Sequence, residues 1–283
     1  VGSPTVHGGF VYVGSADGRL HAIDARSGRL RWDFKTGGAV DSTPAVADGL
    51  AIVRSGDSRI FAFDAADGKR RWVYQRTTPS LSLRSNVGVL PVGKVTLAGF
   101  PGGKLVAIAN NNGAAVWEVT VALPKGATEL ERVADVTSSP AISGSMVCAA
   151  AFQGRAACFD SNTGNTVWSR DMSSSTGLDI DNRYVYVTDD KGSVHPLDRN
   201  SGASIWKQDK LAQRRLSRPV ALAGGRVAVA DYQGVVHLLR QEDGAFAARA
   251  ATDGSAVRAE PVRYGAGMLV QTANGGLFVL EAN

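Results

Sequence analysis

The chain has 283 residues, enough to bury a hydrophobic core, and its length alone is compatible with one large domain or two average ones. Its 31 Lys and Arg are scattered among 26 Asp and Glu, which argues against a nucleic-acid groove and against a polybasic membrane anchor. Gly is abundant at 33 residues and no apolar run approaches about 18 residues, so we expect an all-β protein that does not span a membrane.

The chain begins with Val1-Gly2-Ser3-Pro4. This segment has no initiator Met, no charged region and no apolar region of a signal peptide. We therefore expect that any targeting segment has been removed or is not included in this sequence.

A repeat of roughly 40 residues organises the chain. Its first copy reads Gly18-Arg19-Leu20-His21-Ala22-Ile23-Asp24, followed by Gly28 and Trp32. Copies start at 18, 58, 103, 154, 192, 234 and 275, and all five Trp lie 14 residues after a start. Pro residues 14 or 15 positions before a start keep the same phase: Pro4, Pro44, Pro140, Pro219 and Pro261.

The second copy divides most clearly into short strands separated by turns rich in Gly and Asp. We predict strands at Thr43–Val46, Leu50–Val53, Arg59–Phe63 and Arg70–Tyr74. Four antiparallel strands in each period of about 40 residues correspond to one blade of a β-propeller. The sequence therefore predicts a single β-propeller domain over residues 1–283, with about seven four-stranded blades and a Trp packed between neighbouring sheets.

The last copy reaches only a third strand, at Phe278–Glu281. Propellers commonly complete such a blade with a strand from the N-terminus, so we expect the natural protein to be longer at that end, by a strand or a whole blade. The open edge of the last blade also suggests that an extended client segment binds there as an added strand.

Two sets of polar residues follow the repeat. Asp24, Asp64, Asp160 and Asp198 each precede a turn that ends in Gly, and we expect these carboxylates to bond the turn backbone instead of forming a catalytic or metal-binding ring. His21, His195 and His237 share one position that is apolar in other copies, so we predict no metal site there.

Cys148 and Cys158 flank a predicted hairpin in which they would face each other across two strands. Two cysteines are too few for a disulfide framework, and their spacing does not match a CxxC redox or zinc site. An oxidising compartment permits a bond between them, whereas cross-strand geometry is often strained, so the sequence leaves the bond open.

The AxDxxxGxxxW pattern resembles the repeat of pyrroloquinoline-quinone type propellers, which include both enzymes and scaffolds. Two further segments are Pro79-Ser80-Leu81-Ser82-Leu83-Arg84 and Glu131-Arg132-Val133-Ala134-Asp135-Val136-Thr137-Ser138-Ser139-Pro140, in which Asp135 follows Arg84 by 51 residues. These segments resemble the BamB family, lipoprotein subunits of the bacterial outer-membrane β-barrel assembly (BAM) machinery.

This resemblance implies an eight-bladed propeller at the periplasmic face of the outer membrane of a Gram-negative bacterium. It implies anchoring through a lipidated N-terminal Cys that is absent from this sequence, and no cofactor. The implied role is a scaffold that binds the periplasmic POTRA domains of BamA and assists insertion of outer-membrane proteins, with unfolded client proteins as a further partner. The matching BamA-binding positions are Leu81, Leu83, Arg84 and Asp135, while Thr137 departs from the family pattern, which often has a second Asp.

The residues themselves support such a site. Leu81 and Leu83 alternate with Ser82 and face the same way if the segment is extended. Arg84 adds a planar donor fork that suits a partner carboxylate, and an apolar pair beside an Arg is typical of an interface anchor. The alternative is that the leucines belong to a strand core and Arg84 to a solvated turn.

Two other functions remain as alternatives. A quinoprotein dehydrogenase would hold pyrroloquinoline quinone and Ca²⁺ at the propeller centre, but such enzymes are typically much longer, and many carry adjacent cysteines beside the cofactor. The sequence also lacks CxxCH, GxSxG and HExxH motifs. A propeller that binds a small molecule or peptide in its central channel is the second alternative.

Overall fold

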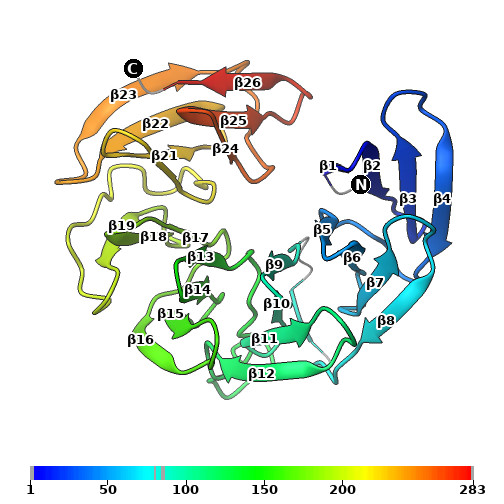
Figure 1. The fold of residues 1–283 in the computed structure, drawn as a ribbon. Coiled ribbons are helices and arrows are strands. Elements are labelled where there is room, and N and C mark those ends of the chain that lie inside the picture. The colour runs from blue at the N-terminus through cyan, green and yellow to red at the C-terminus, as the bar shows by residue number, and fades with distance from the viewer. Residues whose placement is uncertain (1–2, 80, 84–86, 282–283) are drawn as a thin grey trace. The chain divides into compact units, whose positions relative to one another are not determined.

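The computed structural model describes residues 3–79, 81–83 and 87–281, and within these ranges the chain forms 26 β-strands (Figure 1). The strands fall into two compact units, Val1–Pro140 and Ala141–Asn283. In the ranges that the structure describes, no helix has the length and apolar character needed to cross a membrane. The predicted all-β class is therefore confirmed.

The first unit contains three four-stranded antiparallel sheets, each with its strands in chain order. The first sheet consists of β1 (Thr5–His7), β2 (Phe10–Gly14), β3 (Arg19–Asp24) and β4 (Leu30–Lys35). The second consists of β5 (Ala45–Ala47), β6 (Leu50–Arg54), β7 (Ile60–Asp64) and β8 (Arg70–Tyr74). The third consists of β9 (Leu90–Val92), β10 (Val95–Phe100), β11 (Lys104–Ala109) and β12 (Ala115–Thr120).

The second unit contains four antiparallel sheets, again in chain order. The fourth sheet of the chain consists of β13 (Ala141–Ser143), β14 (Met146–Ala150), β15 (Arg155–Asp160) and β16 (Thr166–Asp171). The fifth consists of β17 (Leu178–Ile180), β18 (Tyr184–Thr188) and β19 (Val194–Asp198). The sixth consists of β20 (Val220–Leu222), β21 (Arg226–Ala230), β22 (Val235–Arg240) and β23 (Phe246–Ala251), and the seventh of β24 (Val262–Tyr264), β25 (Gly267–Gln271) and β26 (Leu277–Leu280).

The repeat phase read from the sequence matches the strands closely. In the second sheet only the first strand is displaced by more than a residue, because it begins at Ala45 and not at Thr43. Each in-phase Pro directly precedes the first strand of its sheet, where its missing N–H removes no ladder hydrogen bond. These strands begin at Thr5, Ala45, Ala141, Val220 and Val262.

The fifth sheet differs from the predicted four strands. Its fourth segment makes only isolated bridges, Leu197 to Ser204 and Val194 to Gln208, in place of a strand that contains Trp206. Pro196 lies in β19 between these two bridges. Its carbonyl accepts a hydrogen bond from the Ile205 amide, but Pro has no N–H to return, so the ladder is interrupted.

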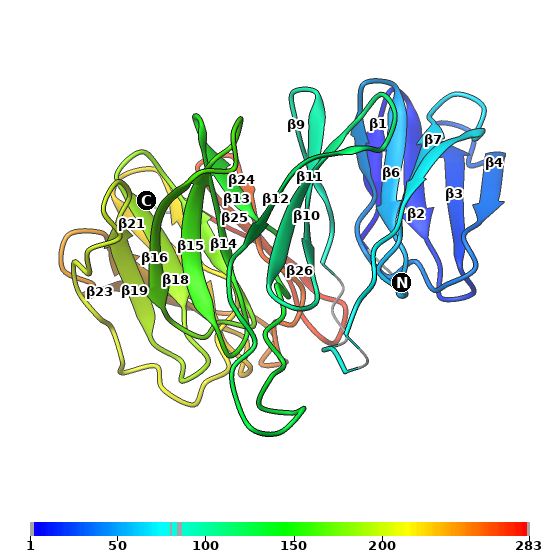
Figure 2. The ribbon, with the colours of Figure 1, turned by 90° about the horizontal axis from the view of Figure 1, so that it is seen from below.

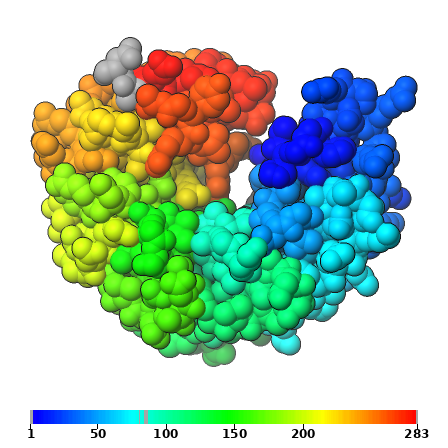
Figure 3. All heavy atoms as spheres, viewed as in Figure 1, coloured from blue at the N-terminus to red at the C-terminus, as the bar shows by residue number. Residues whose placement is uncertain are grey.

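Within each unit, the hydrophobic core lies between the faces of consecutive sheets. One cluster, for example, joins Leu50, Ile52 and Ile60 of the second sheet to Ala98 and Val106 of the third. The first strands also contact one another within each unit, β1 with β5 and β5 with β9, and these segments are in continuous contact in the space-filling view (Figure 3). Each sheet is therefore stabilised mainly by its neighbours.

The repeat Trp and the repeat Gly of the following sheet form a pair. The ring of Trp72 lies against Gly113, where an added Cβ would be 2.8 Å from the indole, and the indole N–H donates to the Asn110 carbonyl at 2.7 Å. Gly113 also has φ +75°, which disfavours any residue with a Cβ. The same pairing recurs between Trp32 and Gly68, Trp168 and Gly202, and Trp206 and Gly244.

Cys148 and Cys158 lie directly opposite each other on β14 and β15 and form a disulfide bond. Both residues are fully buried in the core between the fourth and fifth sheets. The structure thus resolves the question that the sequence left open.

Removing this disulfide should destabilise the protein. We expect the Cys148→Ala, Cys158→Ala double variant to lose about 2–3 kcal/mol of unfolding free energy, because the unfolded chain gains the freedom of the opened loop. Urea denaturation of the oxidised wild type, the reduced wild type and the variant measures the effect. Equal midpoints for the oxidised and reduced wild type would contradict the prediction.

Candidate partner-binding site

A tight turn between β10 and β11 supports the candidate site. Gly102 and Gly103 both have positive φ, and two connecting segments pack on them. An added Cβ would lie 3.5 Å from the Pro79 ring at Gly102 and 2.1 Å from the Ala122 carbonyl oxygen at Gly103. Figure 2 shows the segment that follows β8 and the segment that follows β12 at the same end of β10 and β11.

Asp135 joins these segments through backbone hydrogen bonds. One carboxylate oxygen accepts from the Leu83 amide at 2.6 Å, and the other accepts from the Gly102 amide at 2.9 Å. The residue is only 2% exposed. Asp135 therefore fixes the backbone at Leu83 with a buried carboxylate, and its predicted contact with a partner stays a prediction.

The side chains of Leu81 and Leu83 are 40% and 38% exposed. Monomeric proteins rarely expose clustered large apolar side chains unless these form an interaction site. Neither Leu81 nor Leu83 belongs to a strand, so the alternative of a strand core does not apply to them. Arg84 lies outside the described residues, and its role stays a prediction. Thr137 is half-buried.

Arg54, at the end of β6, was missed by the sequence analysis. Its guanidinium donates to the Gly99 carbonyl and lies 5.2 Å from the centre of the Phe100 ring. Burial lowers the pKa of Arg54 to about 10, and the negative charge of Asp135 partly opposes this shift. A charged residue that ends the apolar run Leu50-Ala51-Ile52-Val53 is the one signal that could have identified it.

Two guanidinium groups lie over the Phe100 ring, an arrangement that stabilises both cations by contact with the aromatic ring. The second group belongs to Arg76, which lies 5.6 Å from the ring centre and 3.3 Å from a Glu118 carboxylate oxygen. The Phe100 carbonyl accepts from the amide of Val136, the residue after Asp135. The segment that contains Asp135 is thus attached both to Phe100 and, through the Asp135 carboxylate, to the amides of Leu83 and Gly102.

The repeat carboxylates have the structural role expected from the sequence. Asp24 Oδ1 accepts from the backbone amides of Arg26 and Ser27, at 3.1 and 2.7 Å, and these bonds lower the pKa of Asp24. Asp160 and Asp198 make the equivalent bonds to their own turns, and Asp64 bonds the Ala66 amide. They close turns within the blades.

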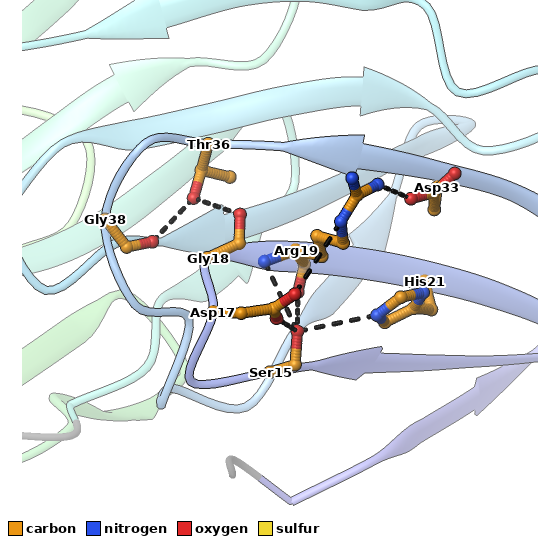
Figure 4. Close-up of polar contacts among 8 residues, drawn as sticks. All are labelled: Ser15, Asp17, Gly18, Arg19, His21, Asp33, Thr36 and Gly38. Atoms are coloured by element: carbon orange, nitrogen blue, oxygen red, sulfur yellow. Dashed lines mark hydrogen bonds and ion pairs between the residues drawn. The ribbon is translucent and has the colours of Figure 1, made fainter.

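The repeat histidines also bond locally. Each contacts the residue three positions before its repeat start: His21 Nε2 lies 3.4 Å from Ser15 Oγ (Figure 4), and His195 and His237 lie 2.8 and 3.0 Å from Asp189 and Asp231. Figure 4 also shows Arg19 paired with Asp33, and Thr36 donating to the Gly18 and Gly38 carbonyls, around the same turn. Among the described residues, no group of three or more His, Cys, Asp or Glu could hold a metal ion.

Comparison with known proteins identifies the family. The model of the family described as outer membrane protein assembly factor BamB matches residues 1–208 and 190–283. The chain belongs to the BamB family. It is 42% identical to BamB from Bordetella pertussis over 272 residues, covering 96% of this chain and 70% of the relative. It is 36% identical to BamB from Escherichia coli K12 over 277 residues, covering 98% and 70%.

Solved structures confirm the fold. The crystal structure of BamB from Moraxella catarrhalis superimposes with a TM-score of 0.90 at 29% identity, covering 96% of this chain and 81% of that one. The predicted β-propeller is therefore correct. A quinohemoprotein alcohol dehydrogenase from Pseudomonas putida HK5 gives a TM-score of 0.74 at 14% identity, covering 94% and 61%, and this likeness shows the shared fold alone.

Membership of the BamB family also decides whether the chain is an enzyme. BamB proteins are named as assembly factors, not as enzymes, so the chain is not a quinoprotein dehydrogenase. Fold similarity to an enzyme does not transfer its activity without the site that performs it.

Proposed function

We propose that this protein is a non-enzymatic scaffold of the outer-membrane protein assembly machinery, and that it binds the periplasmic POTRA domains of BamA through Leu81, Leu83 and Arg84. The observation that carries the proposal is the exposure of Leu81 and Leu83, together with the hydrogen bond from the Leu83 amide to the buried Asp135 carboxylate. A segment fixed before binding loses little entropy when a partner docks, so its apolar side chains act as anchors.

The proposal includes a place in the cell. The protein would lie at the periplasmic face of the outer membrane, anchored by a lipidated N-terminal Cys upstream of this sequence. The buried disulfide between Cys148 and Cys158 supports an oxidising compartment such as the periplasm. We propose that residues 1–283 form a single propeller domain. We also propose that the scaffold works without a cofactor.

Unfolded outer-membrane proteins are a further proposed partner. Among the described residues, β26 forms one edge of the seventh sheet, and its side chains Leu277 and Val279 are exposed. An extended client segment would bind such an edge as an added strand.

Calorimetric titration with the isolated POTRA domains of BamA from the same organism tests the main proposal. We expect saturable binding by the wild type and a loss of about 30-fold or more in affinity for Leu83→Asp, because a charge replaces a buried anchor in the complex. Arg84→Glu is expected to act in the same direction.

Leu30→Asp is the matched control, because Leu30 is an exposed leucine of the same unit on β4, outside the candidate site. Its affinity should equal that of the wild type. An equal loss for Leu30→Asp and Leu83→Asp would place the binding site elsewhere, and the absence of wild-type binding would overturn the proposal.

A further inference from the structure

A second pair of exposed leucines lies in the connection between β12 and β13, which we call the 121–135 loop. Leu123 is 64% exposed and Leu130 is 72% exposed. Exposed large apolar side chains gathered in one region mark interaction sites more often than isolated ones do. These two therefore need an account beyond the packing of the third sheet.

The tip of the 121–135 loop is ordered by its own hydrogen bonds. The Glu131 carboxylate accepts from the Ala127 and Thr128 amides at 2.8 and 3.0 Å, and the Glu131 amide donates to Thr128 Oγ1 at 3.2 Å. Arg132 donates to the carbonyls of Gly126 and Ala127 at 3.0 and 3.1 Å. This reciprocal arrangement resembles a capping box and presents Leu130 on a fixed backbone.

Both ends of the loop are attached to the elements that hold Leu81 and Leu83. At one end the Ala122 amide donates to the Gly103 carbonyl at 3.3 Å. At the other end Asp135 bonds the Leu83 and Gly102 amides. The backbone segments that carry the two leucine pairs are therefore both attached, directly or through Asp135, to the Gly102-Gly103 turn of the third sheet.

We propose that Leu123 and Leu130 extend the partner-binding surface, and that they contact an apolar patch on the same POTRA domain that receives Leu81 and Leu83. The inference rests on the proposed function. It deepens that function, because it requires a partner with two separate apolar patches, one for each leucine pair. Asp135 and the Gly102-Gly103 turn connect the segments that carry the two leucine pairs. This connection favours binding of both pairs to one POTRA domain over binding of Leu123 and Leu130 to an unrelated partner.

Single substitutions in the full chain test the inference. We expect Leu123→Ser and Leu130→Ser each to weaken POTRA binding by about 5- to 10-fold in calorimetric titration, the range typical of a significant interface residue. Leu30→Ser, with 57% exposure on β4, should bind like the wild type. Thermal unfolding followed by circular dichroism checks that each variant retains its fold.

A photo-crosslinking residue placed at position 130 gives a second measurement, and the same residue at position 30 is its control. A crosslink to the POTRA domain from position 130 alone supports the inference. Wild-type affinity of both serine variants, together with lost binding of Leu83→Asp, would overturn it and leave the proposed function intact. Absence of any wild-type binding would overturn both.

Discussion

Asp135→Ala should cost the protein both stability and partner binding. Removing the carboxylate leaves two backbone amides without their acceptor and takes a negative charge from the surroundings of the buried Arg54. A buried donor left without its acceptor typically costs about 1–3 kcal/mol, and we expect a loss of stability in this range or above it. Since the Leu83 amide loses its anchor, we also expect affinity for the POTRA domains to fall by about 10-fold or more.

Urea denaturation and calorimetric titration measure these two effects, and hydrogen exchange at the Leu83 amide tests the cause. The amide should exchange faster in Asp135→Ala than in the wild type. Asp135→Asn keeps one acceptor oxygen and should fall between them in stability. If Asp135→Ala lost binding with unchanged stability and unchanged Leu83 exchange, the carboxylate would contact the partner directly.

Trp72→Ala should be among the most destabilising single substitutions in the first unit. The side chain is buried between the second and third sheets, and its indole donates to the Asn110 carbonyl. Replacing a buried Trp by Ala costs about 3–5 kcal/mol, through lost burial and the cavity that remains. The urea midpoint should fall accordingly.

Two further variants serve as controls for this measurement. Trp72→Phe retains most of the buried area but loses the hydrogen bond, and should cost less than Trp72→Ala. Val73→Ala changes an exposed neighbour on β8 and should lie within about 0.5 kcal/mol of the wild type. A loss for Val73→Ala as large as that for Trp72→Ala would contradict the proposed role of the inter-sheet contact.

The repeat could be recognised in the sequence because each of its recurring residues has a role in local structure or in packing against the next sheet. Pro44 marks a strand start, Asp24 closes its own turn, and Gly113 leaves room for the ring of Trp72. Such requirements recur at a constant spacing, so a single chain displays them several times. The interruption at Pro196 also had a visible signal, although the repeat phase predicted a strand beside it.

The candidate site was less accessible because its contacts join residues far apart in the chain. Asp135 bonds Leu83, 52 residues away, and Gly102, 33 residues away. No periodicity relates these positions, so the sequence identified Asp135 only through family resemblance and assigned it to the binding surface. Its burial, and the buried Arg54 near it, emerge only when the segments that follow β8 and β12 are placed at the turn between β10 and β11.

The contact between a Trp and the glycine of the next sheet, made by Trp32, Trp72, Trp168 and Trp206, has a consequence for how the blades vary among relatives. The two positions belong to different blades, yet their side chains compete for the same volume. A larger residue at the glycine would meet the indole, and a smaller residue at the Trp would leave room for it. Where a blade loses its Trp, the following glycine is released from steric exclusion, although its positive φ still favours Gly or Asn. Aligned relatives should therefore show paired substitutions across neighbouring blades, with the Trp of one blade linked to the Gly of the next.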